Sequence, residues 1–265
     1  MSKTFDINID CGESLGNWVM GADEALMPHV TTANVACGFH AGDPMTMQKT
    51  VRLAKANNVA VGAHPGLPDL IGFGRRTMSM TADEVYAMTV FQVGSLKAML
   101  ETEGMTMHHM KPHGAFYAML SVDEALGEAF CRATIDVCPE PMIYYPAPVA
   151  QHAVTRIAAD MGIHVVGELY FDLSYGDDGA LILKRANDGA DLGDTKRRLS
   201  EFLKTGEAIA ESGARVPLEA NSVCLHGDGP NAVDLAKTIG AGLKEAGYTL
   251  EPLAPAPTLK RSAAE

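Results

Sequence analysis

Histidine, lysine and carboxylate residues follow short apolar runs along this chain of 265 residues. Such runs predict buried β-strands, and parallel strands bring their carboxyl-terminal ends to one face of an α/β fold. Imidazoles, ammonium groups and carboxylates gathered on one face can exchange protons, bind anions or hold a metal ion. The pattern therefore predicts a single active site built from the strand ends. The seven runs are FDINIDCGE, TANVACGFH, NVAVGAHPG, MHHMKPHGA, MIYYP, VVGELYFD and SVCLHGD.

Alternation within these strands predicts which side chains share a face. In the first strand Asp6, Asn8 and Asp10 lie on one face, and the apolar Ile7 and Ile9 lie on the other. Because the apolar face suits packing against helices, the acidic face should point into the interior. Interior polar rows are costly unless they bond to one another, to ions or to water, so they predict a deep polar cavity. The other rows are His109, Lys111 and His113, then Glu168, Tyr170 and Asp172, and finally Cys224, His226 and Asp228.

Single residues in this set also have purely structural interpretations. His40 could complete a loop, Asp43 could cap the helix that follows it, and His64 could be a core histidine bonded to backbone. Lys111 is different, because it follows an apolar strand and precedes Pro112, where burial is expected. A buried lysine needs acidic partners, or else it has a depressed pKa useful in catalysis. Taken together, the residues favour an active site over separate structural roles.

Metal and anion binding have weaker signals. Asp10, His40 and His64 lie at the ends of three successive strands, and their carboxylate and two imidazoles could bind a divalent ion. The sequence has no HExxH motif. There is no Walker-type phosphate loop, although backbone N–H groups in HGDGPNA could hold an anion where a helix begins. Arg75 and Arg76 form a paired basic site that could bind a carboxylate or phosphate, or could lie in a solvated loop.

Composition indicates an ordinary globular α/β protein. Hydrophobic residues make up 47% of the chain and charged residues 20%, which is enough for a large core. The net charge of -12 argues against nucleic-acid and anionic-membrane partners, and no apolar run is long enough to span a membrane. The five cysteines lack CxxC and zinc-ribbon spacing and predict reduced thiols. Because the N-terminus does not resemble a signal peptide, we expect a cytoplasmic protein.

Helical apolar spacing between the strands completes a repeating strand–helix pattern, typical of a barrel or a wound sheet. The strongest helix spans residues 81–104, with Thr81 as N-cap, Glu84 in a capping box and Gly104 at its end. The other predicted helices span residues 45–58, 122–137, 147–162, 193–206 and 229–247.

The chain has no sequence signal of a domain boundary. We therefore expect one domain over residues 1–253 and a frayed tail over residues 254–265. The polar, glycine-rich composition of segment 176–193 predicts a mobile loop, an excursion of the chain over the site.

Four long motifs together resemble the LamB/YcsF family. They are DINIDCGESLGNWVMGADEALMPHVTTANVACGFHAGDP, GAHPGLPDLIGFGRR, HMKPHGAFY and VCLHGDGPNAV, and they follow the family order over nearly the whole chain. The resemblance implies an irregular seven-stranded β/α barrel of the glycoside hydrolase and deacetylase type. It also implies a share in the ATP-dependent opening of 5-oxoproline to L-glutamate, as the A subunit of a 5-oxoprolinase that needs two partner subunits, B and C.

The resemblance carries site residues over position by position. The sixth strand departs from the family pattern, because Leu173 stands where arginine is expected and Phe171 replaces a small residue. Downstream, Asp188 occupies a usual proline position. If the missing arginine grips a carboxylate or phosphate, this chain prefers another lactam or amide or couples differently to its partners. The matching residues are Asp10, Glu13, His40, Asp43, His64, Arg75, Arg76, Lys111, His113, His226 and Asp228.

These residues give a hypothesis for lactam hydrolysis. Asp10 acts as general base or as ligand of a metal that activates water, while His64 and His113 transfer protons. Lys111 stabilises the oxyanion or a phosphorylated amide oxygen. The expected substrate-binding residues are Glu13, Asp43, Arg75, Arg76, Glu168, Asp172, His226 and Asp228.

Two other functions stay open. A stand-alone metal-dependent amidohydrolase or deacetylase would bind one divalent ion and act without ATP or partners. A non-catalytic subunit would present a ligand to partner enzymes and would tolerate changes at Asp10 or His64. ATP binding on this chain or on a partner, and a homo-oligomer, are also open.

Overall fold

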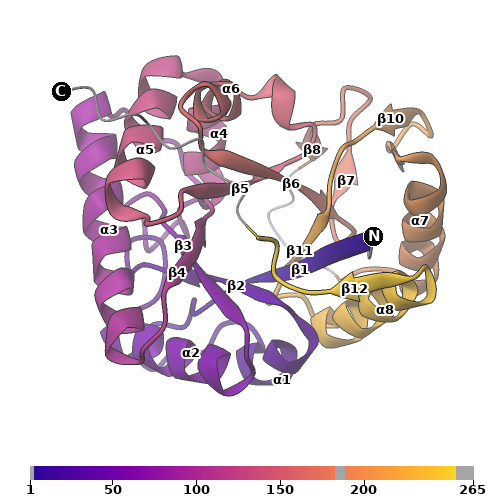
Figure 1. Ribbon diagram of the computed structural model, residues 1–265, viewed down its shortest axis with the longest axis horizontal. Coiled ribbons are helices and arrows are strands. Elements are labelled where there is room, and N and C mark those ends of the chain that lie inside the picture. Colours follow the sequence, from indigo (N-terminus) through magenta and orange to yellow (C-terminus); the bar gives the residue numbers. More distant parts are fainter. Residues whose placement is uncertain (1–2, 183–188, 255–265) are drawn as a thin grey trace.

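Seven parallel strands form a closed barrel in this computed structural model, which describes residues 3–182 and 189–254 (Figure 1). The barrel strands follow one another in chain order, and the last, β11, closes the barrel by pairing with β1. This confirms the predicted single-domain β/α barrel. The barrel strands are β1 (Lys3–Cys11), β2 (Thr32–Ala36), β3 (Ala60–His64), β4 (Met107–Met110), β5 (Met142–Pro146), β6 (His164–Tyr170) and β11 (Ser222–His226).

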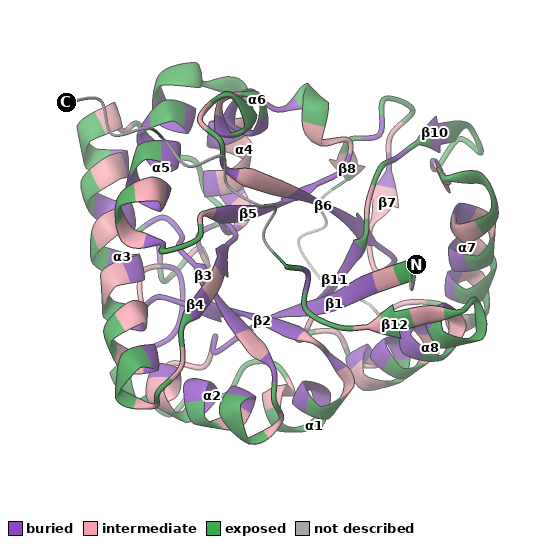
Figure 2. Cartoon of the chain, in the orientation of Figure 1, coloured by how far each residue is buried: buried purple, intermediate pink, exposed green. Residues whose placement is uncertain are grey.

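Helices surround the barrel and connect successive strands (Figure 1). Their inner faces are buried and their outer faces are exposed, as expected for a layer between a sheet and solvent (Figure 2). Among the described residues, no helix has both the length and the apolar character needed to cross a membrane. The helices are α1 (Asp23–Leu26), α2 (Pro44–Ala56), α3 (Ala82–Thr102), α4 (Gly114–Val122), α5 (Glu124–Val137), α6 (Ala153–Asp160), α7 (Leu192–Thr205) and α8 (Ala232–Glu245), with 3₁₀ turns η1 (Met27–His29) and η2 (Val149–Gln151).

Local sequence sets two helix starts as predicted. The Thr81 side chain accepts a hydrogen bond from the backbone N–H of Glu84, and the Glu84 carboxylate accepts one from the N–H of Thr81, so the capping box is confirmed. Asp43 caps α2 by accepting hydrogen bonds from the backbone N–H groups of Met45 and Thr46. This is the structural role considered for Asp43 from the sequence.

Several short elements escape the sequence pattern. α4 begins directly after the fourth barrel strand, and β12 (Tyr248–Leu250) pairs with the first residues of β1. Two hairpins lie between β6 and β11, one made by β7 (Ser174–Tyr175) and β8 (Leu181–Ile182), the other by β9 (Glu207–Ile209) and β10 (Arg215–Pro217).

Two segments of the sequence predictions fall partly on residues that the structure does not describe. The predicted excursion 176–193 contains β8, and its residues 183–188, including Asp188, lie outside the described part of the chain. The predicted tail also lies outside it, apart from Ala254.

The two faces of β1 differ as their alternation predicts. Ile7 and Ile9 are fully buried in the main hydrophobic cluster between barrel and helices. Asp6 and Asn8 are equally buried but bond to the neighbouring strand β11, where the Ser222 hydroxyl donates to Asp6 and Asn8 donates to Ser222. Burial raises the pKa of Asp6 to about 6, although hydrogen bonds from neighbouring hydroxyls oppose the shift. The barrel interior is therefore polar, unlike the aliphatic layers that fill most barrels.

Candidate active site

A cavity of about 330 Å³ lies at the carboxyl-terminal ends of the barrel strands. Its volume is within the range of small-molecule sites, and this end of a β/α barrel is where such sites form. Charged residues and aromatic rings share its wall. The charged and histidine lining residues are Asp10, Glu13, His64, Arg75, Lys111, His113, Asp172, His226 and Asp228, and the aromatic ones are Phe73, Tyr117, Tyr144, Tyr145 and Tyr170.

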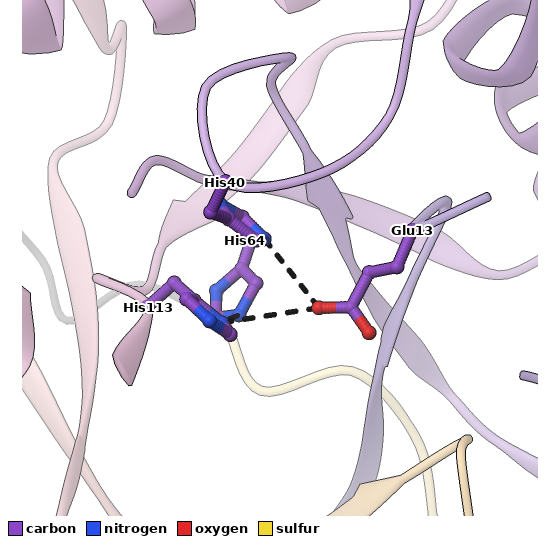
Figure 3. Close-up of side chains that lie close together, drawn as sticks. All are labelled: Glu13, His40, His64 and His113. Carbon is purple, nitrogen blue, oxygen red and sulfur yellow. Dashed lines mark hydrogen bonds and ion pairs between the residues drawn. The ribbon is translucent and has the colours of Figure 1, made fainter. Parts of the chain in front are cut away.

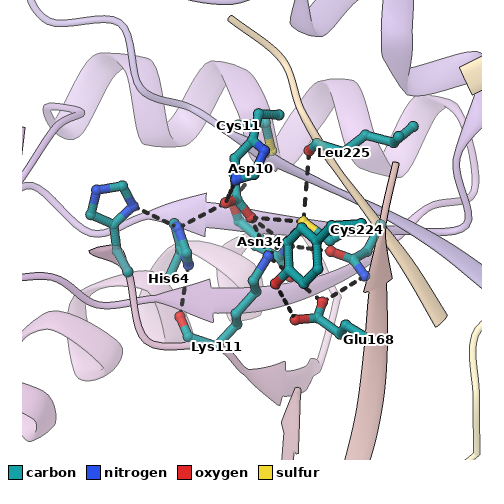
Figure 4. Close-up of polar contacts among 12 residues, drawn as sticks. Asp10, Cys11, Asn34, His64, Lys111, Glu168, Cys224 and Leu225 are labelled. Carbon is teal, nitrogen blue, oxygen red and sulfur yellow. Dashed lines mark hydrogen bonds and ion pairs between the residues drawn. The ribbon is translucent and has the colours of Figure 1, made fainter. Parts of the chain in front are cut away.

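An ion pair between Lys111 and Asp10 forms the centre of the site (Figure 4). Lys111 Nζ lies 2.8 Å from Asp10 Oδ1, 2.7 Å from Cys224 Sγ and 3.6 Å from Glu168 Oε1. Burial by itself would lower the pKa of Lys111, but Asp10, Cys224 and Glu168 raise it well above its ordinary value. Burial would likewise raise the pKa of Asp10, but the cations Lys111 and His226 help to hold it well below its ordinary value. Both groups are therefore ionised, and the buried lysine has the acidic partners that its burial requires.

Hydrogen bonds among neighbouring side chains of the barrel interior orient this ion pair (Figure 4). The Asn34 amide donates to Asp10 Oδ1 at 2.8 Å and to Asn8 Oδ1 at 2.7 Å. Glu168 accepts hydrogen bonds from the Asn8 amide and the Tyr170 hydroxyl, both at 2.8 Å. Glu168 is fully buried and does not line the cavity, so it acts on the site by positioning its neighbours.

His226 and Asp172 form a second charged pair on the cavity wall. His226 Nδ1 lies 2.7 Å from Asp172 Oδ2, and the backbone N–H of His226 donates to the same oxygen at 3.1 Å. The other ring nitrogen, Nε2, lies 3.8 Å from Asp10 Oδ2. Burial would lower the pKa of His226, but the Asp172 carboxylate raises it to about 9. At neutral pH this histidine is therefore a cation with its free N–H directed toward Asp10.

Four residues at or just after the carboxyl-terminal ends of β1, β2, β3 and β4 form a buried cluster beside the ion pair (Figure 3). His64 Nε2 lies 3.0 Å from His113 Nδ1, His40 Nε2 lies 3.4 Å from Glu13 Oε1, and His113 Nδ1 lies 3.8 Å from the same oxygen. One ligand atom from each residue lies within 4.8 Å of all the others. Burial raises the pKa of Glu13 and lowers the pKa values of His40 and His113. This buried group could hold a metal ion.

Backbone conformation brings the cluster together. Gly12 has a φ of 68°, which turns the chain at the end of β1 and directs Glu13 toward the histidines. Phe73 also has a positive φ, 53°, which is uncommon for a residue other than glycine. Its carbonyl oxygen accepts a hydrogen bond from His113 Nε2 at 2.8 Å. The carbonyl of Lys111 accepts one in the same way from His64 Nδ1 at 2.7 Å.

The structure separates residues that the sequence motifs group together. Arg75 lines the cavity, with its guanidinium 5.0 Å from the centre of the Phe73 ring. Arg76 instead pairs with Asp69 and is largely exposed, and it does not line the cavity. Asp43 does not line it either, because its carboxylate caps α2. The structure thus brings one of the two arginines to the cavity.

The predicted metal set is also divided. His40 and His64 lie together as predicted, but the carboxylate that joins them is Glu13, and His113 adds a third imidazole. Asp10 Oδ2 lies 3.4 Å from His64 Nε2, outside that group of ligand atoms. Strand alternation alone cannot place Glu13 beside the histidines, because Glu13 follows the end of β1.

Several lining residues escaped the sequence reasoning. Tyr144 and Tyr145 lie near the end of β5. Tyr117 lies on α4, a helix that was not predicted from the sequence. Asn34 supports the ion pair from β2. The alternation of TANVA places Thr32 and Asn34 on one face, and this signal could have identified Asn34.

Comparison with known proteins shows which family this chain resembles. The LamB/YcsF family profile matches residues 5–258. The chain is 49% identical over 250 residues to the 5-oxoprolinase A subunit numbered 2 in Bordetella bronchiseptica, covering 93% of this chain and 98% of that protein. It is 41% identical over 251 residues to the 5-oxoprolinase A subunit of Brevibacillus brevis, covering 94% and 97%.

Solved structures agree with the sequence comparison. The lactam utilization protein from Thermus thermophilus has a TM-score of 0.85 and 36% identity, covering 94% of this chain and 100% of that protein. A family 4 carbohydrate esterase from Streptomyces lividans has a TM-score of 0.51 at 11% identity, which is a likeness of fold alone. The matches at high identity extend over nearly the whole chain and include every strand that lines the cavity. The chain therefore belongs to the LamB/YcsF family.

Proposed function

We propose that this chain is the A subunit of an ATP-dependent 5-oxoprolinase and opens the lactam of 5-oxoproline to L-glutamate together with partner subunits B and C. Its buried Lys111–Asp10 pair carries the proposal, because it supplies a permanent cation at the wall of a cavity sized for a small molecule. Relatives named as 5-oxoprolinase A subunits match it over almost its full length. ATP is used in the assembled complex.

The cavity offers separate sites for the two ends of such a substrate. In the described part of the chain Arg75 is the arginine that lines the cavity, and a guanidinium can hold a carboxylate through two parallel hydrogen bonds. Tyr117 and Leu173 provide apolar wall for the ring. Leu173 stands where the family pattern has arginine, so Arg75 binds the carboxylate without that second cation.

Lys111 stabilises the charge that develops on the amide oxygen. Attack on a lactam carbonyl moves negative charge onto this oxygen, and a fixed cation nearby lowers the barrier. Asp10 keeps Lys111 charged in its buried position, and Asn34 keeps Asp10 in place. A phosphoryl group on the amide oxygen would bring negatively charged oxygens that can use the same cation.

Water attack and ring opening then need one proton acceptor and one proton donor. His64 and His113 both line the cavity and can position the attacking water, directly or through a group bound between them. Asp10, 3.4 Å from His64, takes the proton as the new carbon–oxygen bond forms. His226 is charged and lines the same cavity, so it can give a proton to the ring nitrogen as the carbon–nitrogen bond breaks.

The proposal is tested by measuring L-glutamate formation from 5-oxoproline with purified chain, with ATP, and with subunits B and C, omitting each in turn. We expect glutamate only from the complete mixture. Glutamate formed by the chain alone, without ATP, would instead support a metal-dependent amidohydrolase. The buried cluster of Glu13 and three histidines favours considering this metal-dependent amidohydrolase as a second function.

A further inference from the structure

The histidine tautomers in the buried cluster follow from their backbone partners. A neutral imidazole has one N–H and one lone pair, and a carbonyl oxygen can only accept a hydrogen bond. His64 Nδ1 bonds to the Lys111 carbonyl and His113 Nε2 bonds to the Phe73 carbonyl, so these two nitrogens carry the hydrogens. The remaining nitrogens, His64 Nε2 and His113 Nδ1, therefore direct lone pairs at each other across 3.0 Å.

Two further groups in the same place have no hydrogen-bond partner, although they lie 3.4 Å from each other. Both ring nitrogens of His40 and the Oε1 atom of Glu13 are buried without a hydrogen-bond partner. His40 is 1% exposed and Glu13 is 8% exposed, so solvent does not replace the missing partners. Unsatisfied buried polar atoms are costly, and here they converge on one point.

We infer that Glu13, His40, His64 and His113 form a binding site for a divalent transition-metal ion of the zinc class. A proton shared by His64 and His113 would satisfy their two lone pairs but would leave His40 without a partner. One cation would bond to one nitrogen of each imidazole and to the Glu13 carboxylate together. Three imidazoles with one carboxylate, and no thiolate, suit zinc and its neighbours better than magnesium or calcium, which prefer oxygen ligands.

Distances in the cluster are close to those of a zinc site. Zinc–ligand bonds of about 2.0–2.1 Å in a tetrahedral arrangement place ligand atoms about 3.4 Å apart. The corresponding separations here are 3.0 Å, 3.4 Å and 3.8 Å, and none exceeds 4.8 Å.

The surroundings hold the ligands as metal sites require. The hydrogen bonds to the carbonyls of Lys111 and Phe73 are the outer contacts that orient metal-binding imidazoles. A Cβ on Gly66 would lie 2.3 Å from His40 Nδ1, and one on Gly74 would lie 2.6 Å from His40 Cβ. Backbone therefore encloses His40 tightly enough to restrict its ring.

The open side of the cluster is the cavity. Glu13, His64 and His113 all line it, so a bound ion would be within reach of a ligand there. Such an ion would supply a Lewis acid that polarises a carbonyl or lowers the pKa of water. The site stands on the contacts of these residues and does not depend on the 5-oxoprolinase proposal.

Metal binding can be measured on the full-length chain without substrate or partner subunits. The chain is stripped with a chelator and titrated with ZnCl₂ by calorimetry, and bound zinc is counted by mass spectrometry after gel filtration. We expect one zinc ion per chain, and a Co²⁺-loaded sample with the visible absorption of tetrahedral nitrogen and oxygen coordination. Failure of the glutamate assay would leave this result unchanged, so the two proposals are tested separately.

Glu13→Gln and His40→Gln test the ligands, with His152→Gln as a matched control. His152 is a buried histidine that bonds to the Pro146 carbonyl and lies outside the cluster. We expect each ligand variant to lose zinc affinity by about 100-fold or more and the control to keep it. Circular dichroism establishes that the variants are folded. Substoichiometric zinc in the wild-type chain, or equal affinity in folded ligand variants and control, would overturn the inference.

Discussion

Replacing Asp172 by asparagine removes the carboxylate that keeps His226 charged and changes the size of the side chain little. Asp172 raises the pKa of His226 from 6.5 to about 9, against the effect of burial. That difference corresponds to about 3 kcal/mol, at about 1.4 kcal/mol for each pKa unit. Burial and Lys111 oppose this shift and Asp10 adds to it, so the figure is the net effect of all these groups on His226.

The substitution should change the charge of His226 at working pH. With a pKa of about 9, about 97% of the His226 side chains carry a proton at pH 7.5, whereas a pKa near 6.5 leaves about 9% charged. If His226 gives the proton to the leaving nitrogen, turnover of the assembled complex at pH 7.5 should fall by about tenfold from this population change alone. The wild-type rate should stay high up to about pH 9 and fall above it.

Stability should change with pH in a matching way. The pKa of His226 is higher in the folded chain than in the unfolded chain, so the folded state binds more protons. The resulting stabilisation is complete below about pH 6.5 and is lost as the pH rises through about 9. Asp172→Asn should therefore lower the free energy of unfolding most below pH 6.5 and least above pH 9.

Nuclear magnetic resonance titration of the His226 ring measures the pKa directly in the wild-type chain and the variant. Tyr170→Phe is a matched control, since its ring is stacked on His226 at 5.9 Å and the change removes no charge. We expect the control to keep the raised pKa and Asp172→Asn to lose it. A wild-type pKa near 6.5, or an unchanged value in Asp172→Asn, would refute the reasoning.

Four further substitutions separate structural from substrate-binding roles. Asp43→Ala removes the cap of α2 and should lower the free energy of unfolding by about 1–2 kcal/mol in urea titrations, without changing turnover in the complex. Lost turnover with unchanged stability would instead show that Asp43 takes part in catalysis or substrate binding. Arg75→Met should raise KM by about 10- to 100-fold, because it removes a charge-assisted hydrogen bond to the substrate carboxylate. Arg76→Met should leave KM unchanged, and equal effects of the two arginines would contradict their separate placement. Gly62→Ala puts a methyl group 2.4 Å from the His109 ring and should destabilise the chain by about 1–3 kcal/mol, whereas an unchanged melting temperature would show that the ring can move aside.

Alternation within strands predicted the central pair of the site. The apolar and polar faces of the first strand are distinct, so Asp10 could be placed inside the barrel from the sequence, and the same argument applied to Lys111. Asp10 is fixed by the pleat of β1, and Lys111 directly follows the last residue of β4 and continues its alternation, so the closed parallel barrel brings the two side chains together.

Residues beyond the strand ends could not be placed in this way. Glu13 reaches the histidines because Gly12 turns the chain with a positive φ, and periodicity does not report such a turn. Arg76 is drawn to Asp69, a competing partner within its own loop, while the adjacent Arg75 faces the cavity. β12 is three residues long, too short for a periodic pattern.

Turnover of the assembled complex with altered Lys111 tests the central claim most directly. Lys111→Met alone leaves Asp10 buried without its cation and can destabilise the chain, so the double variant Asp10→Asn/Lys111→Met, which removes both charges, is measured beside it. Lys97→Met, on the outer helix α3, is the control.

We predict that ATP-dependent formation of L-glutamate from 5-oxoproline is lost in the folded double variant and in Lys111→Met, and is kept in the control. Retained glutamate formation in the folded double variant would contradict the account, because the proposed cation would then be unnecessary for opening the lactam.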